Sequence, residues 1–340
     1  MRQEEPGAPR KTTLAAIAAE AGVSLPTVSK VLNGRPDVSA ETRARVARLL
    51  DQHNYSRGTS RRHRRSGLID LVFNGLDSPW AVEILRGVEE WGSANSTGVA
   101  VSAVRHGDAR PTSWTGTLAS HDTDGVILVT SELTSSQLGQ LRNAGIPLVV
   151  IDPVNPPPPE IPSVGATNWA GGLSATEHLL GLGHRRIGTI AGPGDFLCSR
   201  ARVDGYRSAL EREGITFDPD LVRHGDFHHE GGFARGGELL DLPDRPTAIF
   251  AGSDQQAFGV YEAARQHGLR IPEDIAVVGF DDIEDARYAF PTLTTISPDK
   301  KNIARLAVAR LFERMKGAEV LPASRSVEYR LVIRESTSGR

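Results

Sequence analysis

The chain has 340 residues, more than one ordinary hydrophobic core accommodates, so two or three domains are expected. Its 39% hydrophobic and 24% charged residues are typical of a soluble globular protein. The opening segment MRQEEPGAPRK has no apolar core of signal-peptide length, and no apolar run reaches the length of a membrane span of about 18 residues. A single cysteine, Cys198, excludes an intrachain disulfide. These features predict a cytoplasmic protein.

The net charge of −3 conceals a strong asymmetry along the chain. Residues 1–66 contain 13 Lys and Arg against 6 Asp and Glu, a balance of +7, and the remainder contains 26 against 36, a balance of −10. A basic N-terminal segment on an acidic body indicates contact with a polyanion such as nucleic acid. A solvated basic tail is the alternative that charge alone leaves open.

Apolar spacing predicts a first short helix near the start of the basic segment. Leu14, Ile17, Ala18 and Ala21 fall on one helical face. Gly22 ends this helix, because glycine adopts a positive φ without strain.

A second helix follows at once and a third supports it. Ser24 is a natural N-cap and Pro26 fits the first turn of the second helix. Its inward residues are Val28, Val31 and Leu32. The third helix is expected from Ser39 to about Leu50, with Val46, Leu49 and Leu50 turned inward. Two short helices joined by a glycine turn, with a support helix, predict a helix-turn-helix domain.

The second helix of such a motif enters the major groove of DNA. Its outward residues are Leu25, Pro26, Thr27, Ser29 and Lys30. The Thr27 and Ser29 hydroxyls suit phosphates, Lys30 can donate to guanine, and the first two residues offer only apolar contact. A three-helix bundle without a role on DNA is the alternative.

The segments GVS (22–24) and TVSKVLNG (27–34) resemble the signature of the LacI family of bacterial repressors. The resemblance implies that Leu25, Pro26 and Lys30 read bases. It also implies that the DNA backbone is held by Thr13, Ser24, Thr27, Ser29 and Asn33. Lysine stands where arginine is commoner, which gives up bidentate geometry.

The linker departs from the family pattern. The family reads Tyr-x-Pro-Asn-x-x-Ala-Arg-x-Leu here, and its leucine wedges into the minor groove. In this chain YSRGTSRRHRR (55–65) carries Arg57, Gly58 and, at the wedge position, Arg64. We expect an electrostatic grip with a steep salt dependence. The DNA-contacting residues predicted in this segment are Tyr55, Arg61, Arg62 and Arg64. A disordered basic linker is the alternative for the free protein.

From Gly67 onward, apolar runs of strand length alternate with helical segments such as 80–92 and 134–144. The runs are 67–74, 99–104, 124–130, 147–152, 185–192, 247–252 and 275–282. This alternation predicts an α/β fold of two doubly wound lobes with parallel sheets, after an all-α N-terminal domain.

The expected organisation is a tail (1–11), the helix-turn-helix domain (12–56), a basic hinge (57–66) and a body (67–340). Within the body, lobe 1 is expected at about 67–160 plus 284–298, and lobe 2 at about 161–283 plus 299–340. The proline-rich residues 153–163 are interpreted as a crossing between lobes or its exposed loop.

Ligands of parallel sheets bind beyond the carboxyl ends of the strands. The residues expected there are Trp80, Arg202, Asp226, Phe227, Ser253, Asp254, Asp281 and Asp282. An aromatic face with charged hydrogen-bonding groups suits a sugar. Asp254 has a competing interpretation as a helix cap.

The LacI resemblance continues through the body in GDF (225–227), GFDD (279–282), PTLTT (291–295) and REST (334–337). It implies a body similar to periplasmic sugar-binding proteins. The implied effector-binding residues are Arg202 and Asp281, the aromatic Phe227, and the pocket-lining Trp80, Ala81 and Ser253. Thr167-Asn168 stands where the family often has Asp-Asn, which implies the loss of one charged contact.

The sequence therefore predicts a homodimeric repressor that binds a roughly palindromic operator and responds to a small sugar, with no cofactor, metal or membrane. A solute-binding protein and a corepressor-dependent regulator of a non-sugar ligand remain as alternatives. An enzyme is not expected, because the nucleophile-elbow, P-loop and His-Glu-x-x-His motifs are missing. His224, His228, His229 and Glu230 form the one cluster with metal-binding residue types, and a solvated loop is favoured there.

Overall fold

The structure is a computed structural model that describes residues 13–32, 38–53, 66–104, 114–118, 122–317 and 325–338. The chain divides into two compact units, Met1–Arg64 and Arg65–Arg340. No single helix of the described residues is long and apolar enough to cross a membrane; the first two reach that length and composition only together, bent by 100°.

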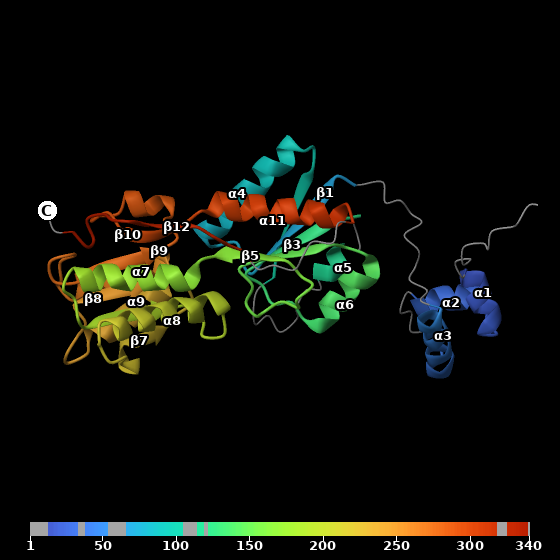
Figure 1. Ribbon diagram of the computed structural model, residues 1–340, viewed down its shortest axis with the longest axis horizontal. Helices are drawn as coiled ribbons and strands as arrows, with labels where there is room; N and C mark the ends of the chain where they lie inside the picture. The colour runs from blue at the N-terminus through green and yellow to red at the C-terminus, as the bar shows by residue number, and fades with distance from the viewer. Residues whose placement is uncertain are drawn as a thin grey trace, which may run out of the picture. The chain divides into compact units, whose positions relative to one another are not determined.

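The smaller unit contains the three predicted helices. They are α1 (Leu14–Glu20), α2 (Leu25–Leu32) and α3 (Ala40–Gln52), shown in Figure 1. The hydroxyl of Thr13 caps α1 by accepting a hydrogen bond from the Ala16 N–H at 3.3 Å. Gly22, with φ of +63°, makes the turn into α2 as predicted.

These helices enclose one small core drawn from all three apolar stripes. Its buried members are Ile17, Ala18, Ala21, Val28, Val46 and Leu50. Leu14, Val31 and Leu49 are partly buried against them. Predicted inward faces and observed burial therefore agree, apart from the Leu32 side chain, which lies outside the described residues.

The larger unit contains two six-stranded sheets. The first has the order β11 (Arg325–Val327), β5 (Ser163–Ala166), β4 (Leu148–Ile151), β3 (Gly125–Val129), β1 (Leu68–Phe73) and β2 (Gly98–Ala103). The second has the order β12 (Tyr329–Val332), β10 (Thr294–Pro298), β9 (Ala276–Phe280), β8 (Ala248–Ala251), β6 (Ile187–Ala191) and β7 (Val222–His224). Among the described strands, β10 pairs with β12 in antiparallel fashion, and the other pairs are parallel.

Helices cover both faces of each sheet, as Figure 1 shows. The first sheet packs against α4 (Pro79–Ala94) and α11 (Lys300–Met315) on one side and α5 (Trp114–Leu118) and α6 (Ser135–Ala144) on the other. The second sheet packs against α7 (Asn168–Gly181) and α8 (Leu197–Arg212) on one side and α9 (His229–Leu240) and α10 (Asp254–Gln266) on the other. Short 3-10 turns lie at η1 (Pro219–Leu221) and η2 (Glu284–Arg287). The predicted fold class is confirmed.

The predicted lobe boundaries need correction. Of the proline-rich residues 153–163, Ser163 begins β5 and the others join β4 to β5 within the first sheet, so they form a loop and not a crossing. The chain crosses between sheets near Thr167, Asp299 and Glu328. Residues 294–298 consequently belong to the second lobe, because β10 pairs with β9. The helix at 300–315 and the strand at 325–327 belong to the first lobe, because the apolar face of α11 packs on its sheet and β11 pairs with β5.

Candidate functional site

Five described residues at or shortly beyond the carboxyl ends of strands have a left-handed backbone. They are Thr130 after β3, Asp152 after β4, Phe227 three positions beyond β7, and Asp281 and Asp282 after β9, with φ of 43°, 41°, 71°, 113° and 50°. Left-handed conformations are costly for residues other than glycine and concentrate at functional sites. The strand ends of both lobes therefore mark a candidate site, as parallel-sheet topology predicts.

A cavity of about 370 Å³ lies at these strand ends. This volume falls within the range of small-molecule pockets, about 300–1,000 Å³. All six residues predicted for the effector site line the cavity: Trp80, Ala81, Arg202, Phe227, Ser253 and Asp281. Asp77 and Asp226, from the sequence segments of Trp80 and Phe227, line it too. The structure thus brings together side chains from both lobes, such as Asp77 and Asp281, that lie 204 positions apart in the chain.

The prediction did not include several other residues of the cavity wall. Prominent among them are Thr130, Asp152, Phe196, Cys198, His228 and Gln255. Asp152 could have been found, because it follows the apolar residues 147–151 in the same way as Asp281 follows 275–280. Phe196 and Cys198 belong to the N-terminal end of α8 and carry no comparable sequence signal.

Arg202 holds the centre of the polar network. Its side chain is buried, and its guanidinium lies 3.6 Å from the centroid of the Phe280 ring and 5.4 Å from that of Phe227. Nε donates to the Asn168 side-chain oxygen at 2.9 Å, and a terminal nitrogen donates to the Gly252 carbonyl oxygen. The other terminal nitrogen lies 4.0 Å from the carboxylate of Asp281. Stacking and hydrogen bonds together fix one orientation of the guanidinium.

Asn168 connects this arginine to a second acid. Its side-chain nitrogen donates to Asp152 Oδ1 at 3.3 Å, and the same oxygen accepts the Ala166 N–H at 3.1 Å. The preceding Thr167 donates its hydroxyl to the Val327 carbonyl oxygen and does not line the cavity. The sequence predicted that threonine at position 167 removes one carboxylate from the pocket. Asp152, which follows β4, supplies a carboxylate near Arg202 instead.

Two buried carboxylates face the cavity. Burial raises the pKa of Asp152 to about 6, and the neighbouring Arg202 opposes this rise. Burial also raises the pKa of Asp281 to about 6, against the attraction of Arg202 and Lys300. Because a carboxylate accepts hydrogen bonds with both oxygens, this pair can hold two neighbouring hydroxyl groups of a ligand.

Replacing Asp152 by asparagine is expected to stabilise the protein at neutral pH. The folded-state pKa of about 6 exceeds the reference value of 3.8, so the folded chain binds this proton more tightly than the unfolded chain. The carboxylate therefore destabilises the fold above about pH 6, and this penalty vanishes below about pH 4. Asp152→Asn should raise the free energy of unfolding by about 2–3 kcal/mol at pH 7.5 and change it little at pH 4.

Unfolding of wild type and variant at the two pH values measures this effect. The exposed Asp204 on α8 provides the matched control. Asp204→Asn should change stability by less than about 0.5 kcal/mol at both pH values. An Asp152→Asn difference that is independent of pH would contradict the electrostatic explanation.

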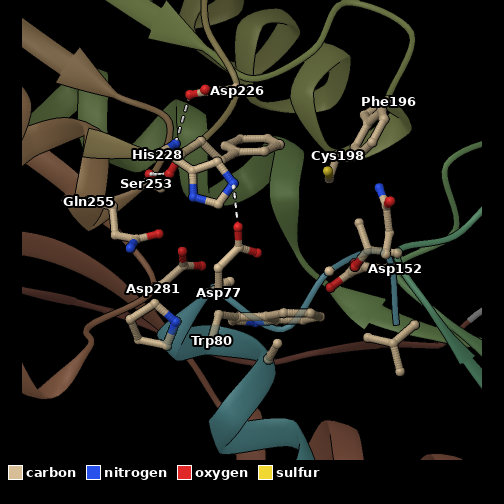
Figure 2. Close-up of a pocket in the computed structure, with 18 of the residues that line it drawn as sticks. Asp77, Trp80, Asp152, Phe196, Cys198, Asp226, His228, Ser253, Gln255 and Asp281 are labelled. Atoms are coloured by element: carbon tan, nitrogen blue, oxygen red, sulfur yellow. Dashed lines mark hydrogen bonds and ion pairs between the residues drawn. The ribbon is translucent and has the colours of Figure 1, made fainter. Parts of the chain in front are cut away.

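The remaining wall of the cavity is largely aromatic. Trp80 lies in the first turn of α4, and Phe196 and Phe227 come from the second lobe, with ring centroids 6.4 Å apart. Figure 2 shows Trp80 in the lower part of the site, with Asp152 to its right. Cys198 also faces this space, and burial raises the pKa of its thiol to about 11, so it stays protonated at neutral pH. Flat apolar walls with carboxylates between them suit a ligand with apolar faces and a polar rim.

Ser253 and Asp254 have different roles. The Ser253 hydroxyl caps α10 by accepting the Gln256 N–H at 3.0 Å and donates to the Phe227 carbonyl oxygen at 2.7 Å, which holds the Phe227 backbone in place. Asp254 is fully buried; it accepts the Thr295 hydroxyl at 2.5 Å and the Ile283 N–H at 2.8 Å. It therefore supports the loop after β9 and is not the cap that the sequence left open.

The two lobes contact each other across the cavity through Asp77 and His228. Asp77 precedes α4 in the first lobe, and His228 is the N-cap of α9 in the second. His228 Nε2 lies 4.0 Å from Asp77 Oδ2, and the His228 N–H donates to Asp226 Oδ1 at 2.9 Å (Figure 2). Among the described residues no group of three His, Cys, Asp or Glu side chains is arranged to hold a metal ion.

The exposed face of α2 carries the residues predicted to meet DNA. Leu25 is 48% exposed, which is unusual for leucine, and Pro26 and Lys30 are exposed beside it. Thr27 and Ser29 are partly buried, and the Thr27 N–H donates to the Ser24 hydroxyl at 3.3 Å. Five further residues predicted to contact DNA lie outside the described residues. They are Asn33, Tyr55, Arg61, Arg62 and Arg64.

Known proteins match both parts of the chain. The family model described as bacterial regulatory proteins, lacI family, matches residues 13–58, and a periplasmic binding protein-like domain matches residues 176–337. The chain is 33% identical over 329 residues to the HTH-type transcriptional repressor CytR of Escherichia coli (strain K12), covering 96% of both chains. The chain belongs to the lacI family. Like the other members of this family, it is a DNA-binding transcriptional regulator.

Solved structures of family members share its fold. A transcriptional regulator CelR–cellobiose complex has a TM-score of 0.75 and 35% identity, covering 96% of this chain and 99% of the other. The lac repressor dimer bound to operator and the anti-inducer ONPF has a TM-score of 0.71 and 28% identity, covering 96% and 99%. The lacI-family recognition drawn from short motifs is therefore confirmed over nearly the whole chain.

Proposed function

We propose that this regulator is a homodimeric repressor that releases its operator when a small sugar occupies the cavity between the lobes. The observation that carries the sugar assignment is the wall of the cavity: aromatic rings of Trp80, Phe196 and Phe227 with the buried carboxylates of Asp152 and Asp281. Sugars have apolar faces and rims of hydroxyls, which these groups match. The cellobiose complex of CelR supports the same class of ligand.

The polar residues of the cavity have separable roles in this proposal. Arg202, held by Asn168 and stacked on Phe280, donates to ligand oxygens, while Asp152 and Asp281 accept from hydroxyl groups. Trp80 and Phe227 pack on the faces of the sugar ring, and Ala81 and Ser253 complete the wall. No step in this mechanism breaks a covalent bond, so we propose that the chain acts as a regulator and not as an enzyme.

On DNA, α2 is proposed to lie in the major groove of each half of a palindromic site. Lys30 donates to guanine, Leu25 and Pro26 contact bases through apolar groups, and Ser24, Thr27 and Ser29 hold phosphates. Thr13 and Asn33 are proposed as further backbone contacts. The operator-bound dimer of the lac repressor supports this arrangement. Such a protein acts in the cytoplasm, at the nucleoid.

The linker is part of the DNA-binding surface in this proposal. Tyr55, Arg61, Arg62 and Arg64 are proposed to contact the DNA, with arginine in the minor groove in place of an apolar wedge. Replacing the linker arginines by alanine should then lower affinity and flatten its salt dependence. An unchanged salt slope would remove the linker from the interface.

Two measurements test the proposed function. A thermal-shift screen of the full chain against mono- and disaccharides should find at least one that raises the melting temperature, since a ligand of the native state stabilises it by mass action. An operator selected from random duplexes is then titrated by fluorescence anisotropy with and without that sugar. The sugar should weaken operator binding about 5- to 150-fold, the usual range of allosteric coupling. Tighter operator binding with sugar would show that the protein depends on a corepressor. Failure to find any sugar that raises the melting temperature would refute the sugar assignment.

A further inference from the structure

We propose that Asp77 and Asp226, two exposed carboxylates of the cavity wall, are specificity-determining residues that exclude phosphorylated sugars while neutral sugars enter. The inference rests on the proposed function, because it states which sugars the cavity accepts. It concerns residues outside the set that grips the ligand, and it follows from the distribution of charge around the cavity.

Negative groups outnumber positive groups along the described wall. Four carboxylates line the cavity, those of Asp77, Asp152, Asp226 and Asp281. Against them stand the Arg202 guanidinium and the His228 imidazole. A cleft lined by one sign of charge concentrates ligands of the opposite charge, repels those of the same sign and hardly affects neutral ones. A phosphate group therefore meets an unfavourable potential in this cavity.

Both groups that could offset a phosphate already face carboxylates. Arg202 donates to Asn168 and to the Gly252 carbonyl, and its remaining terminal nitrogen lies 4.0 Å from Asp281. The His228 ring lies 4.0 Å from Asp77, and the backbone N–H of His228 donates to Asp226 Oδ1. Bidentate recognition of phosphate uses two parallel donors. Nε and one terminal nitrogen of this guanidinium are already engaged, which leaves the other terminal nitrogen for a single hydrogen bond to a ligand oxygen.

The four carboxylates differ in exposure. We assign ligand binding to the two buried ones and selectivity between ligands to the two exposed ones. Asp152 and Asp281 are 8% and 9% exposed and lie beside Arg202. Asp77 and Asp226 are exposed, and they come from opposite lobes, one before α4 and the other before α9. Figure 2 places both beside His228. A ligand that enters between the lobes passes this outer pair, whose field acts on a charged ligand and hardly on a neutral one.

The cavity could also reject phosphate esters because of their size. A sugar with an amino group distinguishes rejection by size from rejection by charge. A phosphate ester adds bulk and negative charge, whereas an amino group in place of a hydroxyl adds positive charge without bulk. Charge selection predicts that the amine is tolerated and the phosphate rejected. Exposed charges are also screened by salt, so the rejection should weaken as ionic strength rises.

Isothermal titration of the full chain tests the proposal with matched ligands. The probes are glucose, galactose and ribose, the terminal phosphate esters of all three, and glucosamine and galactosamine. The best neutral sugar should bind at least tenfold more tightly than its phosphate ester, and the amino sugar should bind within about threefold of its parent. Asp77→Asn/Asp226→Asn should reduce the preference for the neutral sugar about tenfold. Asparagine at position 226 keeps an oxygen acceptor for the His228 N–H, so the local backbone is preserved.

The double variant Asp204→Asn/Asp285→Asn removes two exposed carboxylates outside the cavity wall and should leave the preference unchanged. Phosphate esters that bind the wild type as tightly as their parents would overturn the selectivity proposal alone. Undiminished discrimination in the Asp77→Asn/Asp226→Asn variant, or equal rejection of the amine, would assign the effect to size and overturn it as well. A chain that binds none of these sugars, charged or neutral, would overturn the selectivity proposal, whereas the sugar assignment is refuted only if the screen of mono- and disaccharides also finds no ligand.

Discussion

Arg202→Met is expected to abolish the response to sugar while operator binding persists. The substitution keeps an unbranched apolar stem of similar length but removes the donors that hold Asn168 and face Asp281. Sugar affinity should fall at least 100-fold, because the loss of donors is combined with two acids left without their nearest cation. The acids also make the variant less stable, by about 3 kcal/mol, the usual cost of breaking a buried ion pair.

A set of matched variants separates these two effects. Arg200→Met changes an exposed arginine two positions earlier on α8 and should alter neither property. Arg202→Met/Asp281→Asn removes both partners of this pair and should recover part of the lost stability, since Asp152 still lacks its cation, without restoring the response to sugar. Thermal unfolding, sugar titration and operator anisotropy on these three proteins decide the matter. Loss of operator binding in a folded Arg202→Met protein would show that this arginine serves the reading domain, contrary to the proposal.

The residues at the cavity could be predicted where chemistry and local pattern coincide. Arg202, Phe227 and Asp281 belong to short segments with a distinctive order; Arg202 lies in the second turn of α8, and Phe227 and Asp281 lie beyond strands. Asp152 shares that position but stands at the end of an apolar run with no aromatic or basic neighbour in sequence. Only the approach of the two lobes brings it next to Arg202, 50 positions further along the chain, because β4 belongs to the first sheet and α8 packs on the second.

The lobe boundaries show a different limit. Apolar periodicity identifies a strand but not its neighbours, because strand order depends on pairing between distant segments. β10 and α11 are adjacent in sequence, yet one pairs with β9 and the other packs on the first sheet. A run of prolines at 156–159 suggested a crossing because such runs are extended and exposed, and a loop between neighbouring strands meets the same condition.

Gly172→Ala is expected to damage both the stability of the second lobe and its grip on the ligand. α7 and α8 approach so closely that a Cβ at Gly172 would lie 2.3 Å from the Arg202 carbonyl oxygen, and one at Gly205 would lie 2.1 Å from the Trp169 carbonyl oxygen. A methyl group at position 172 must therefore push the two backbones apart at the residue that carries the guanidinium. Overpacking of this kind costs about 1–3 kcal/mol, and a contact with backbone places it at the upper end.

Gly181→Ala on the same helix is the matched control, because no atom lies within 4 Å of the added Cβ. It should stabilise the protein by about 0.5–1 kcal/mol, since alanine loses less backbone entropy than glycine on forming a helix. Melting temperatures compare the two variants, and sugar titration shows whether the displaced Arg202 still binds. If Gly172→Ala lowered stability without weakening the sugar, the position of Arg202 would depend on Asn168 and Phe280 rather than on the approach of the two helices. If both fell together, the glycine contact between α7 and α8 would be part of what positions the binding arginine.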